Sequence, residues 1–249
     1  MGRPDLPNCA AMKTYRHVFF DLDHTLWDFK TNSRVVFEQM YREYLVPADP
    51  KMPVERALDR YEYLNAALWK ELRDGRRTKE EVRQMRFRLL LEEALPHVPH
   101  AARCGLSDQM EVDFVRRTPR QQGLMPGAAE VVAALSEKYP LHIITNGFPE
   151  SQVVKMECSG LKPFFKTVTT SEEVGAYKPA RAVFEAALQA AGASPEESIL
   201  IGDGWEADVL GAAAAGMDQV FYNPERALPA TSYRPTHEVH HLRSLLDLL

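Results

Sequence analysis

The sequence contains little cysteine, and its cysteines form no pattern. Cys9, Cys104 and Cys158 lie far apart among 249 residues, without the short spacing of metal ligands or of a disulfide framework. They are predicted to be reduced thiols, which is typical of a cytoplasmic protein. The sequence also lacks any apolar run near the roughly 18 residues that a membrane-spanning helix needs. We therefore expect neither a disulfide-stabilised secreted domain nor a membrane protein.

Residues 1–14 contain no apolar stretch that would make a secretory signal. We expect a loose tail here, with Met12 as an alternative to Met1 for the native start. Basic residues are not in excess, because the net charge is −5. This charge favours neither a nucleic-acid polymer nor a membrane as a partner. The expected partner is a small molecule, and the expected assembly is a monomer or a homodimer.

An acidic motif accompanies the first apolar run. Val18 to Leu22 has the length and the β-favouring composition of a buried strand, and Asp21 and Asp23 stand two residues apart at its end. Paired carboxylates at the end of a buried strand are costly unless a positive charge lies between them. A divalent cation with oxygen ligands is the simplest such partner. A solvated acidic turn is the alternative when this motif is taken alone.

Helical spacing of apolar residues dominates the segment 29–119. One helix is predicted through 36–45 and a second through 57–72. A third begins with the capping-box pair Thr78 and Glu81, and a weaker fourth covers 107–117. The segment is therefore predicted to be a small all-helical block.

From Leu124 onward, apolar strands alternate with helices. The predicted strands are 141–145, 167–170, 198–202 and 219–222, and the predicted helices are 126–138, 149–158, 179–191 and 207–215, with a short strand and a helix in 237–249. This alternation predicts an α/β fold with a doubly wound parallel sheet and helices on both faces. Residues 15–28 and 120–249 are expected to form this core, and the segment 29–119 is expected to be an inserted α-helical cap domain.

Polar residues follow the ends of four predicted strands. Asp21 and Asp23 follow the first, and the other three are followed by Thr145-Asn146-Gly147, by Lys178, and by Asp203 with Asp208. In a doubly wound sheet, ligands bind beyond the carboxyl ends of the strands. We therefore expect these side chains to converge on one site.

This set of side chains suits phosphoryl transfer. Asp21 can attack phosphorus to give an aspartyl-phosphate. Asp23 can protonate the leaving alkoxide and then deprotonate the water that hydrolyses the intermediate. Lys178 supplies positive charge for the nucleophile and the phosphate. Thr145 and Asn146 are predicted to hold phosphate oxygens at a helix start, and a simple helix cap is the alternative role of Thr145.

Mg²⁺ is the predicted cofactor, because a cation offsets the repulsion between a carboxylate and a phosphate dianion. Its predicted ligands are Asp21, the backbone carbonyl of Asp23, and Asp203. Asp208 is predicted to belong to the metal site as well, where it orients Lys178 or a metal-bound water. The alternative for Asp208 is an acidic residue that complements a helix dipole.

These motifs resemble a known superfamily. Asp21–Thr25, Thr145–Gly147, Lys178–Pro179 and Gly202–Asp208 resemble, in order and spacing, the four signature motifs of the haloacid-dehalogenase (HAD) superfamily. The resemblance covers nearly the whole chain from about Tyr15. A helical insert directly after the first motif is similar to the C1 cap of the phosphatase branch.

Shorter strings resemble one subgroup, the pyrimidine 5′-nucleotidases or house-cleaning nucleotidases. They are Ile144–Phe148, Ser171–Gly175 and Leu68–Trp69. This resemblance implies a Mg²⁺-dependent phosphatase that hydrolyses nucleoside 5′-monophosphates through an aspartyl-phosphate. His24 stands where many members have glycine, and Gly204 stands where serine or threonine is common. Neither departure removes a reactive group.

Four further residues are candidates for contacting the substrate. They are Phe29, Asn65, Trp69 and Arg86. Packing of the hinge is the alternative role of Phe29, and packing in the cap core is that of Trp69. Asn65 shares a helical face with Trp69. A solvated surface position is the alternative for Arg86.

Other functions remain open at this point. They are a phosphatase for phosphoglycolate or a sugar phosphate, a sugar phosphomutase, a 2-haloacid dehalogenase and a non-catalytic binding domain. Asp23 and Asp203 argue against the dehalogenase, because such an enzyme needs neither a metal nor an acid two residues after its nucleophile.

Overall fold

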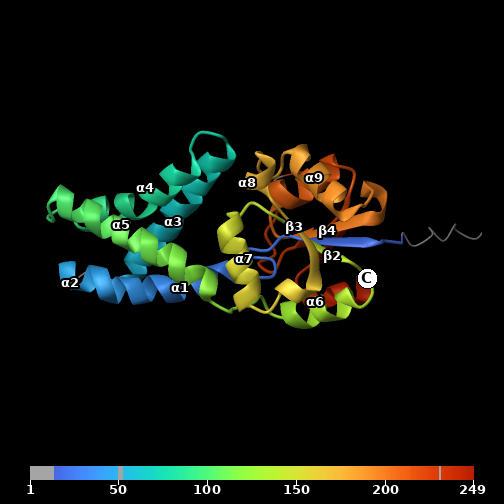
Figure 1. The fold of residues 1–249 in the computed structure, drawn as a ribbon, viewed down its shortest axis with the longest axis horizontal. Helices are drawn as coiled ribbons and strands as arrows, with labels where there is room; N and C mark the ends of the chain where they lie inside the picture. Colours follow the sequence, from blue (N-terminus) through green and yellow to red (C-terminus); the bar gives the residue numbers. More distant parts are fainter. Residues whose placement is uncertain (1–13, 50–52, 230) are drawn as a thin grey trace, which may run out of the picture.

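The computed structural model describes residues 14–49, 53–229 and 231–249, and it has two parts (Figure 1). A sheet flanked by helices forms one part, and a bundle of helices forms the other. The predicted tail, with Met12, lies outside the described residues apart from Thr14. Within the described ranges, every helix is too short or too polar to traverse a lipid bilayer.

The described part of the chain forms one sheet of six strands in the order β3-β2-β1-β4-β5-β6, and all neighbouring strands are parallel. The strands are β1 (His17–Phe20), β2 (Leu141–Thr145), β3 (Phe165–Thr170), β4 (Ser198–Gly202), β5 (Asp218–Tyr222) and β6 (His237–Val239). The predicted doubly wound parallel sheet is confirmed. Because β1 lies between β2 and β4, the acidic motif after it lies in the middle of the carboxyl edge.

Helices cover both faces of this sheet. On the central strand β1, Val18 and Phe20 belong to one hydrophobic cluster and Phe19 belongs to the other, as the alternation of side chains along a strand requires. The first cluster includes residues of α6 (Ala128–Ser136), α7 (Pro149–Cys158) and α11 (Leu245–Leu248), and the second includes residues of α9 (Arg181–Ala191) and α10 (Gly211–Ala214). Helices α6 and α9 lie on opposite sides of the sheet in Figure 1.

The inserted segment is a helical cap with a core of its own. Its helices are α1 (Phe29–Met40), η1 (Tyr41–Leu45), α2 (Val46–Ala48), α3 (Val54–Arg73), α4 (Lys79–Ala94) and α5 (His100–Arg117). The ring of Tyr61 stacks between the rings of Phe37 and Phe87, with centroid distances of 5.0 and 5.5 Å. The predicted helical cap is confirmed, while its boundaries at 29 and 119 remain predictions.

Two chain passages join the cap to the core, and they are bonded to each other. The Asn32 side chain donates to the Gly123 carbonyl at 2.8 Å and accepts from the Gly123 N–H at 3.1 Å. The Trp27 indole donates to the Gln121 carbonyl at 3.1 Å. The entry to the cap and the exit from it therefore form one connected hinge.

Some element limits differ from the sequence-based predictions. Strand β1 ends at Phe20, not at Leu22, because the Leu22 carbonyl accepts from the N–H groups of Leu26 and Trp27 and the chain turns. Helix α5 begins at His100 rather than near residue 107. The predicted helix 207–215 begins as the π-helical segment η5 (Trp205–Leu210) and continues as α10. The short helices α8 (Ser171–Val174), η2 (Thr118–Arg120), η3 (Lys162–Phe164), η4 (Pro195–Glu197) and η6 (Leu242–Ser244) complete the described elements.

Candidate active site

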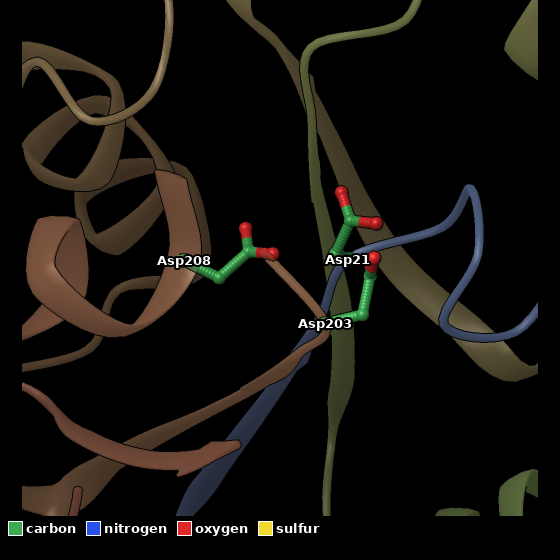
Figure 2. A group of neighbouring side chains, drawn as sticks. All are labelled: Asp21, Asp203 and Asp208. Atoms are coloured by element: carbon green, nitrogen blue, oxygen red, sulfur yellow. The ribbon is translucent and has the colours of Figure 1, made fainter. Parts of the chain in front are cut away.

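Three carboxylates gather at the middle of the carboxyl edge. Asp21 follows β1, Asp203 follows β4, and Asp208 lies on η5. One carboxylate oxygen from each lies within 4.8 Å of one from the others, as the close-up in Figure 2 illustrates. The sequence placed these residues at strand ends, and the parallel sheet brings them together. This cluster is the natural place for a cation.

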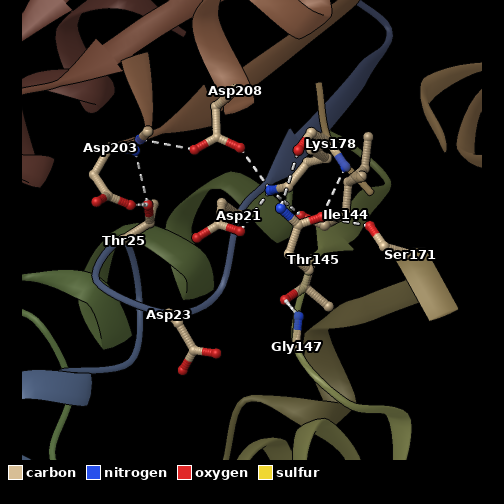
Figure 3. A network of polar contacts seen from close by, with 12 residues as sticks. Asp21, Asp23, Thr25, Ile144, Thr145, Gly147, Ser171, Lys178, Asp203 and Asp208 are labelled. Atoms are coloured by element: carbon tan, nitrogen blue, oxygen red, sulfur yellow. Dashed lines mark hydrogen bonds and ion pairs between the residues drawn. The ribbon is translucent and has the colours of Figure 1, made fainter. Parts of the chain in front are cut away.

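Lys178 fills the space beside two of these carboxylates. Its ammonium group donates to Asp21 Oδ1 at 2.7 Å, to Asp208 Oδ1 at 2.6 Å and to the Ile144 carbonyl at 2.9 Å (Figure 3). A lysine ammonium has three protons, so these contacts use all of its donors. The side chain is 2% exposed. Lys178 is therefore fixed against the Asp21 carboxylate and cannot turn away without leaving donors unpaired.

The Asn146 side chain holds the main chain of Lys178. Asn146 Oδ1 accepts from the Lys178 N–H at 2.8 Å and from the Ser171 hydroxyl at 2.5 Å, and its amide nitrogen donates to the Lys178 carbonyl at 3.2 Å. The side chain is thus used for positioning Lys178. The predicted contact of Asn146 with phosphate remains a prediction for its main-chain N–H.

Thr25 and two glycines set the positions of Asp203 and Asp208. The Thr25 hydroxyl donates to Asp203 Oδ1 at 2.9 Å and accepts from the Asp203 N–H at 3.1 Å. Asp208 Oδ2 accepts from the Gly204 N–H at 2.8 Å. A Cβ at Gly202 or Gly204 would approach the Asp208 carboxylate to 2.5 or 2.8 Å. Glycine at position 204, where serine or threonine is common in the superfamily, therefore makes room for Asp208.

Burial and mutual repulsion shift the acidity of this cluster. Burial raises the pKa of Asp21 well above its usual value, and the charges of Asp208 and Asp203 raise it further against the opposing effect of Lys178. Burial, together with the charge of Asp208, raises the pKa of Asp203 to about 6. The pKa of Lys178 is raised, because its two carboxylate partners outweigh its burial. One ammonium group does not balance three carboxylates, so the site attracts a further positive charge.

Asp23 is held apart from this cluster by two residues that the sequence did not single out. Lys155 on α7 contacts its two carboxylate oxygens at 2.6 and 2.8 Å, and the Gln152 amide donates to Oδ2 at 2.9 Å. Burial raises the pKa of Asp23, but Lys155 and Gln152 more than offset this, and the net pKa is lowered. In Figure 3 the Asp23 side chain points away from the Lys178 network.

Aromatic rings of the hinge cover Lys155. Its ammonium group lies 4.6 Å from the ring centroid of Trp27 and 5.5 Å from that of Phe29. The helical spacing of Gln152 and Lys155 gave no functional signal, because a lysine on an amphipathic helix is usually solvated. Here the lysine is 5% exposed and joins the Asp23 loop to the hinge.

Thr145 and Gly147 form the loop after β2. The Thr145 hydroxyl accepts from the Gly147 N–H at 3.0 Å and remains able to donate its own proton. A Cβ at Gly147 would approach the Gln152 side chain to 1.4 Å, so any other residue here would displace Gln152 from its contact with Asp23. Both residues line the cavity described next, where Thr145 can meet a phosphate oxygen.

A cavity of about 420 Å³ lies between the core and the cap. Its volume falls within the range of small-molecule sites, roughly 300–1,000 Å³. From the core it is lined by residues that include Asp21, Asp23, Thr145, Asn146, Lys178, Asp203 and Asp208. The predicted catalytic, phosphate-binding and metal-ligating residues therefore all line one cavity.

Three of the four predicted cap residues also line it. Phe29, Asn65 and Trp69 do so, whereas Arg86 is not among the described residues that form its wall. Arg86 is 4% exposed and makes a bidentate ion pair with Glu111 at 2.6 and 2.7 Å. Its guanidinium group also lies 4.7 Å from the centroid of the Phe114 ring. The structure thus places Arg86 in the core of the cap, neither solvated nor at the cavity.

Phe148, directly after the Thr145–Gly147 loop, is covered by side chains of the cap. Trp69 stacks on its ring with a centroid distance of 4.8 Å. The charged groups of Lys79 and Arg83 lie 4.6 and 4.9 Å from the ring centroid. Both cations also form ion pairs with Glu150 at the start of α7. The loop and the cap therefore share one packed contact.

The fold and the site together define a capped α/β enzyme that carries a buried aspartate beside a lysine, with further aspartates around them. The chain belongs to the haloacid dehalogenase-like hydrolase family, whose model matches residues 15–216. The membership predicted from the four motifs is thereby confirmed.

Known relatives agree with this membership. The chain is 33% identical over 242 residues to the pyrimidine 5′-nucleotidase PynA of Streptococcus pneumoniae, which covers 94% of this chain and 95% of that protein. The magnesium-bound crystal structure of the putative HAD-hydrolase YfnB from Bacillus subtilis has a TM-score of 0.81 at 28% identity, covering 95% of this chain and 99% of that one. A 2-haloacid dehalogenase from Pseudomonas syringae pv. Tomato has a TM-score of 0.66 at 26% identity, with coverages of 94% and 98%.

Proposed function

We propose that this protein is a Mg²⁺-dependent phosphomonoesterase that hydrolyses nucleoside 5′-monophosphates and prefers a pyrimidine base. The observation that carries the proposal is that Asp21, Asp23, Lys178 and Asp203 line a single cavity under the cap. The similarity to PynA over nearly the whole chain supports the nucleotide as substrate. We further propose a cytoplasmic enzyme that is a monomer or a homodimer.

The donor set of the acidic cluster fits Mg²⁺, which prefers oxygen ligands. Asp21 and Asp203 each bond the protein through Oδ1, and among the residues that the structure describes no partner takes either Oδ2. Both oxygens of Asp208 are engaged, by Lys178 and by the Gly204 N–H. Asp21 and Asp203 would therefore hold the ion directly, together with the Asp23 carbonyl, while Asp208 holds Lys178. When bound, Mg²⁺ supplies positive charge that offsets the negative charge of the phosphate.

The residues of the chain perform the reaction in two steps. A carboxylate oxygen of Asp21 attacks phosphorus, and the bond from phosphorus to the ester oxygen breaks. Asp23, which must carry a proton for this step although Lys155 favours its carboxylate form, gives that proton to the leaving alkoxide. Asp23 then takes a proton from the water that attacks the aspartyl-phosphate. Inorganic phosphate leaves, and the Asp21 carboxylate is restored. Lys178 keeps Asp21 oriented throughout, because all three of its protons are engaged.

Phosphate release from a panel of esters tests this function. We expect hydrolysis of UMP and CMP with Mg²⁺ to exceed that of ribose 5-phosphate and phosphoglycolate, and EDTA to abolish it. Preference for phosphoglycolate or a sugar phosphate would show that the enzyme is a phosphatase for that ester and not a nucleotidase. Isomerisation of glucose 1-phosphate would indicate a mutase, and chloride release from a 2-haloacid in EDTA would indicate a dehalogenase. A lack of turnover on every ester would refute the proposal that the protein is a phosphomonoesterase.

Lys155 provides a second prediction about this mechanism. We expect Lys155→Met to lower the turnover of UMP at least tenfold, because Asp23 loses the contacts that position it, and general acid–base catalysis contributes about 10²–10⁴-fold. Turnover of p-nitrophenyl phosphate should fall much less, because nitrophenolate leaves without a proton from Asp23. Steady-state kinetics on both esters measure the difference.

Lys162→Met is a matched control, since Lys162 follows α7 and its side chain is 58% exposed. Equal losses on the two esters in Lys155→Met would show that Lys155 supports only the fold.

A further inference from the structure

We propose that Lys79 of the cap is a positioning residue for the reaction, because it joins the two core segments that present the Thr145–Gly147 loop and Lys178 to the phosphate. This inference rests on the proposed phosphomonoesterase and adds a residue that acts on its phosphate site from outside the cavity. Lys79 is the first residue of α4. Neither Lys79 nor its core partners, Glu150 and Glu172, are among the described residues that line the cavity. Lys79 therefore acts through the segments that it contacts and not on the substrate itself.

One ammonium group reaches both core segments. Lys79 Nζ lies 2.8 Å from a carboxylate oxygen of Glu150, and it donates to both carboxylate oxygens of Glu172 at 3.0 and 3.1 Å. Glu150 lies in the first turn of α7, which follows the Thr145–Gly147 loop, and Glu172 lies on α8, which precedes Lys178. Helix α8 lies next to the α3–α4 end of the cap in Figure 1. Lys79 thus ties the two segments to each other and to the cap.

Apolar packing joins the cap to the residues beside the same two functional groups. Phe148, directly after Gly147, belongs to a cluster with buried side chains of α3 and α4. Tyr177, directly before Lys178, packs against this cluster. The Lys79 ammonium group lies 4.6 Å from the centroid of the Phe148 ring. The ion pairs of Lys79 are therefore one side of a contact that already presses on both segments.

The surroundings of Lys79 favour a fixed, charged side chain. Its side chain is 15% exposed, although Glu150 and Glu172 are more open to solvent. The two carboxylates outweigh the effect of burial, and the pKa of Lys79 is raised. Its ammonium group is therefore charged at every physiological pH, and its contacts do not depend on a change of protonation.

Asn146 joins the same two segments on the side of the core. Its Oδ1 accepts from the Ser171 hydroxyl, one residue before Glu172, and from the Lys178 N–H. The segments would therefore remain connected without Lys79, but only from below. We accordingly expect Lys79 to refine the placement of the phosphate site, so that its loss weakens the reaction without abolishing it.

Lys79→Met tests this role on two esters. We expect kcat/KM to fall by about three- to tenfold, the scale of two partly exposed ion pairs. The factor should be the same for UMP and for p-nitrophenyl phosphate, because both esters present the same phosphate group to the two segments. This result would differ from that of Lys155→Met, whose effect depends on the leaving group. Lys70→Met is the matched control, since Lys70 lies on α3, has a 66% exposed side chain and pairs with Asp74 within the cap.

Phosphate binding gives a readout that does not depend on turnover. The dissociation constant of inorganic phosphate, measured by titration calorimetry with Mg²⁺, should rise at least threefold in Lys79→Met and should not change in Lys70→Met. A Lys79→Met protein that melts earlier, but keeps wild-type kinetics and phosphate affinity well below its melting temperature, would overturn the positioning role. A loss on UMP alone would also overturn it, because such a loss would indicate a contact with the leaving group.

A double variant tests whether Lys79 acts through Glu172. Glu172→Gln alone should lower kcat/KM in the same direction as Lys79→Met, and the double variant should lose no more than Lys79→Met does. Losses that multiply in the double variant would show that the two residues act separately, and would overturn the proposal.

The two proposals fail in different ways. A wild-type enzyme that prefers another ester to UMP would refute the nucleotidase but not the role of Lys79, which concerns the phosphate group alone. A wild-type protein that neither binds phosphate nor hydrolyses any ester would refute both.

Discussion

Asp21→Asn is expected to abolish phosphate release while the protein stays folded. The amide cannot attack phosphorus, so no aspartyl-phosphate forms, and removing a catalytic nucleophile typically lowers turnover by at least about 10³-fold. The asparagine has nearly the same shape and keeps a carbonyl oxygen for Lys178, which remains bonded to Asp208 and to the Ile144 carbonyl. The loss therefore reports the chemistry of Asp21 rather than its packing.

The same change is expected to stabilise the protein when no metal is present. The pKa of Asp21 is raised in the folded state, so ionisation of this carboxyl group destabilises the folded protein relative to the unfolded chain. The protonated Asp21 makes its full contribution to stability below the unfolded pKa of about 4. This contribution is lost as the pH rises through the pKa of Asp21 in the folded state. Asparagine removes this penalty, and the gain should be present at pH 7 and absent near pH 4.

Chemical unfolding in EDTA at these two pH values measures the gain, and phosphate release with Mg²⁺ measures the loss of activity. Asp108→Asn, at an exposed position on α5, should change neither. Full activity of Asp21→Asn would contradict the nucleophile assignment. A loss of stability at pH 7 would contradict the electrostatic description of the acidic cluster.

Lys178→Met is expected to have the largest effect on stability. Lys178 is buried between Asp21 and Asp208, and its removal leaves both carboxylates without their cation. Breaking a buried ion pair in this way costs about 3–5 kcal/mol. For a protein of this size, the melting temperature should fall by roughly 10 °C. Activity should be lost as well, because nothing then orients Asp21 or offsets its charge.

A double variant tests the reason for this effect. Lys178→Met combined with Asp208→Asn removes one of the two uncompensated charges, so it should be more stable than Lys178→Met alone. Thermal unfolding in EDTA compares the two, with Lys166→Met at an exposed position of β3 as the matched control. A double variant no more stable than the single one would show that uncompensated charge is not what destabilises Lys178→Met.

The order of strands and helices, and the site at the carboxyl edge, were predictable because each rests on local sequence. Apolar runs mark the strands, and Asp21, Thr145, Lys178 and Asp203 follow them directly. The rule that parallel strands present their carboxyl ends together then brings these residues to one place. Asp208 was found for the same reason, since it lies five residues beyond Asp203.

What the sequence did not predict depends on contacts between distant segments. Lys155 resembles any lysine on an amphipathic helix until the fold places Asp23, Trp27 and Phe29 around it. Arg86 was considered for the substrate, but its bidentate partner Glu111 lies on the next helix, and helical spacing along one helix does not reveal such a pair. Tyr61 was predicted only as part of an apolar stripe, because its place between the rings of Phe37 and Phe87 depends on the packing of three separate helices.

Phe148 links ligand binding at the segment after β2 to the closure of the cap. Its ring belongs to the segment that holds Thr145 and Gly147, yet it is covered by Trp69, Lys79 and Arg83 of the cap. A ligand that orders this segment therefore favours the closed cap, and closure must increase the affinity for that ligand by the same factor. Separating the cap from the core would carry a hydration cost, because it exposes an aromatic face of Phe148 to water.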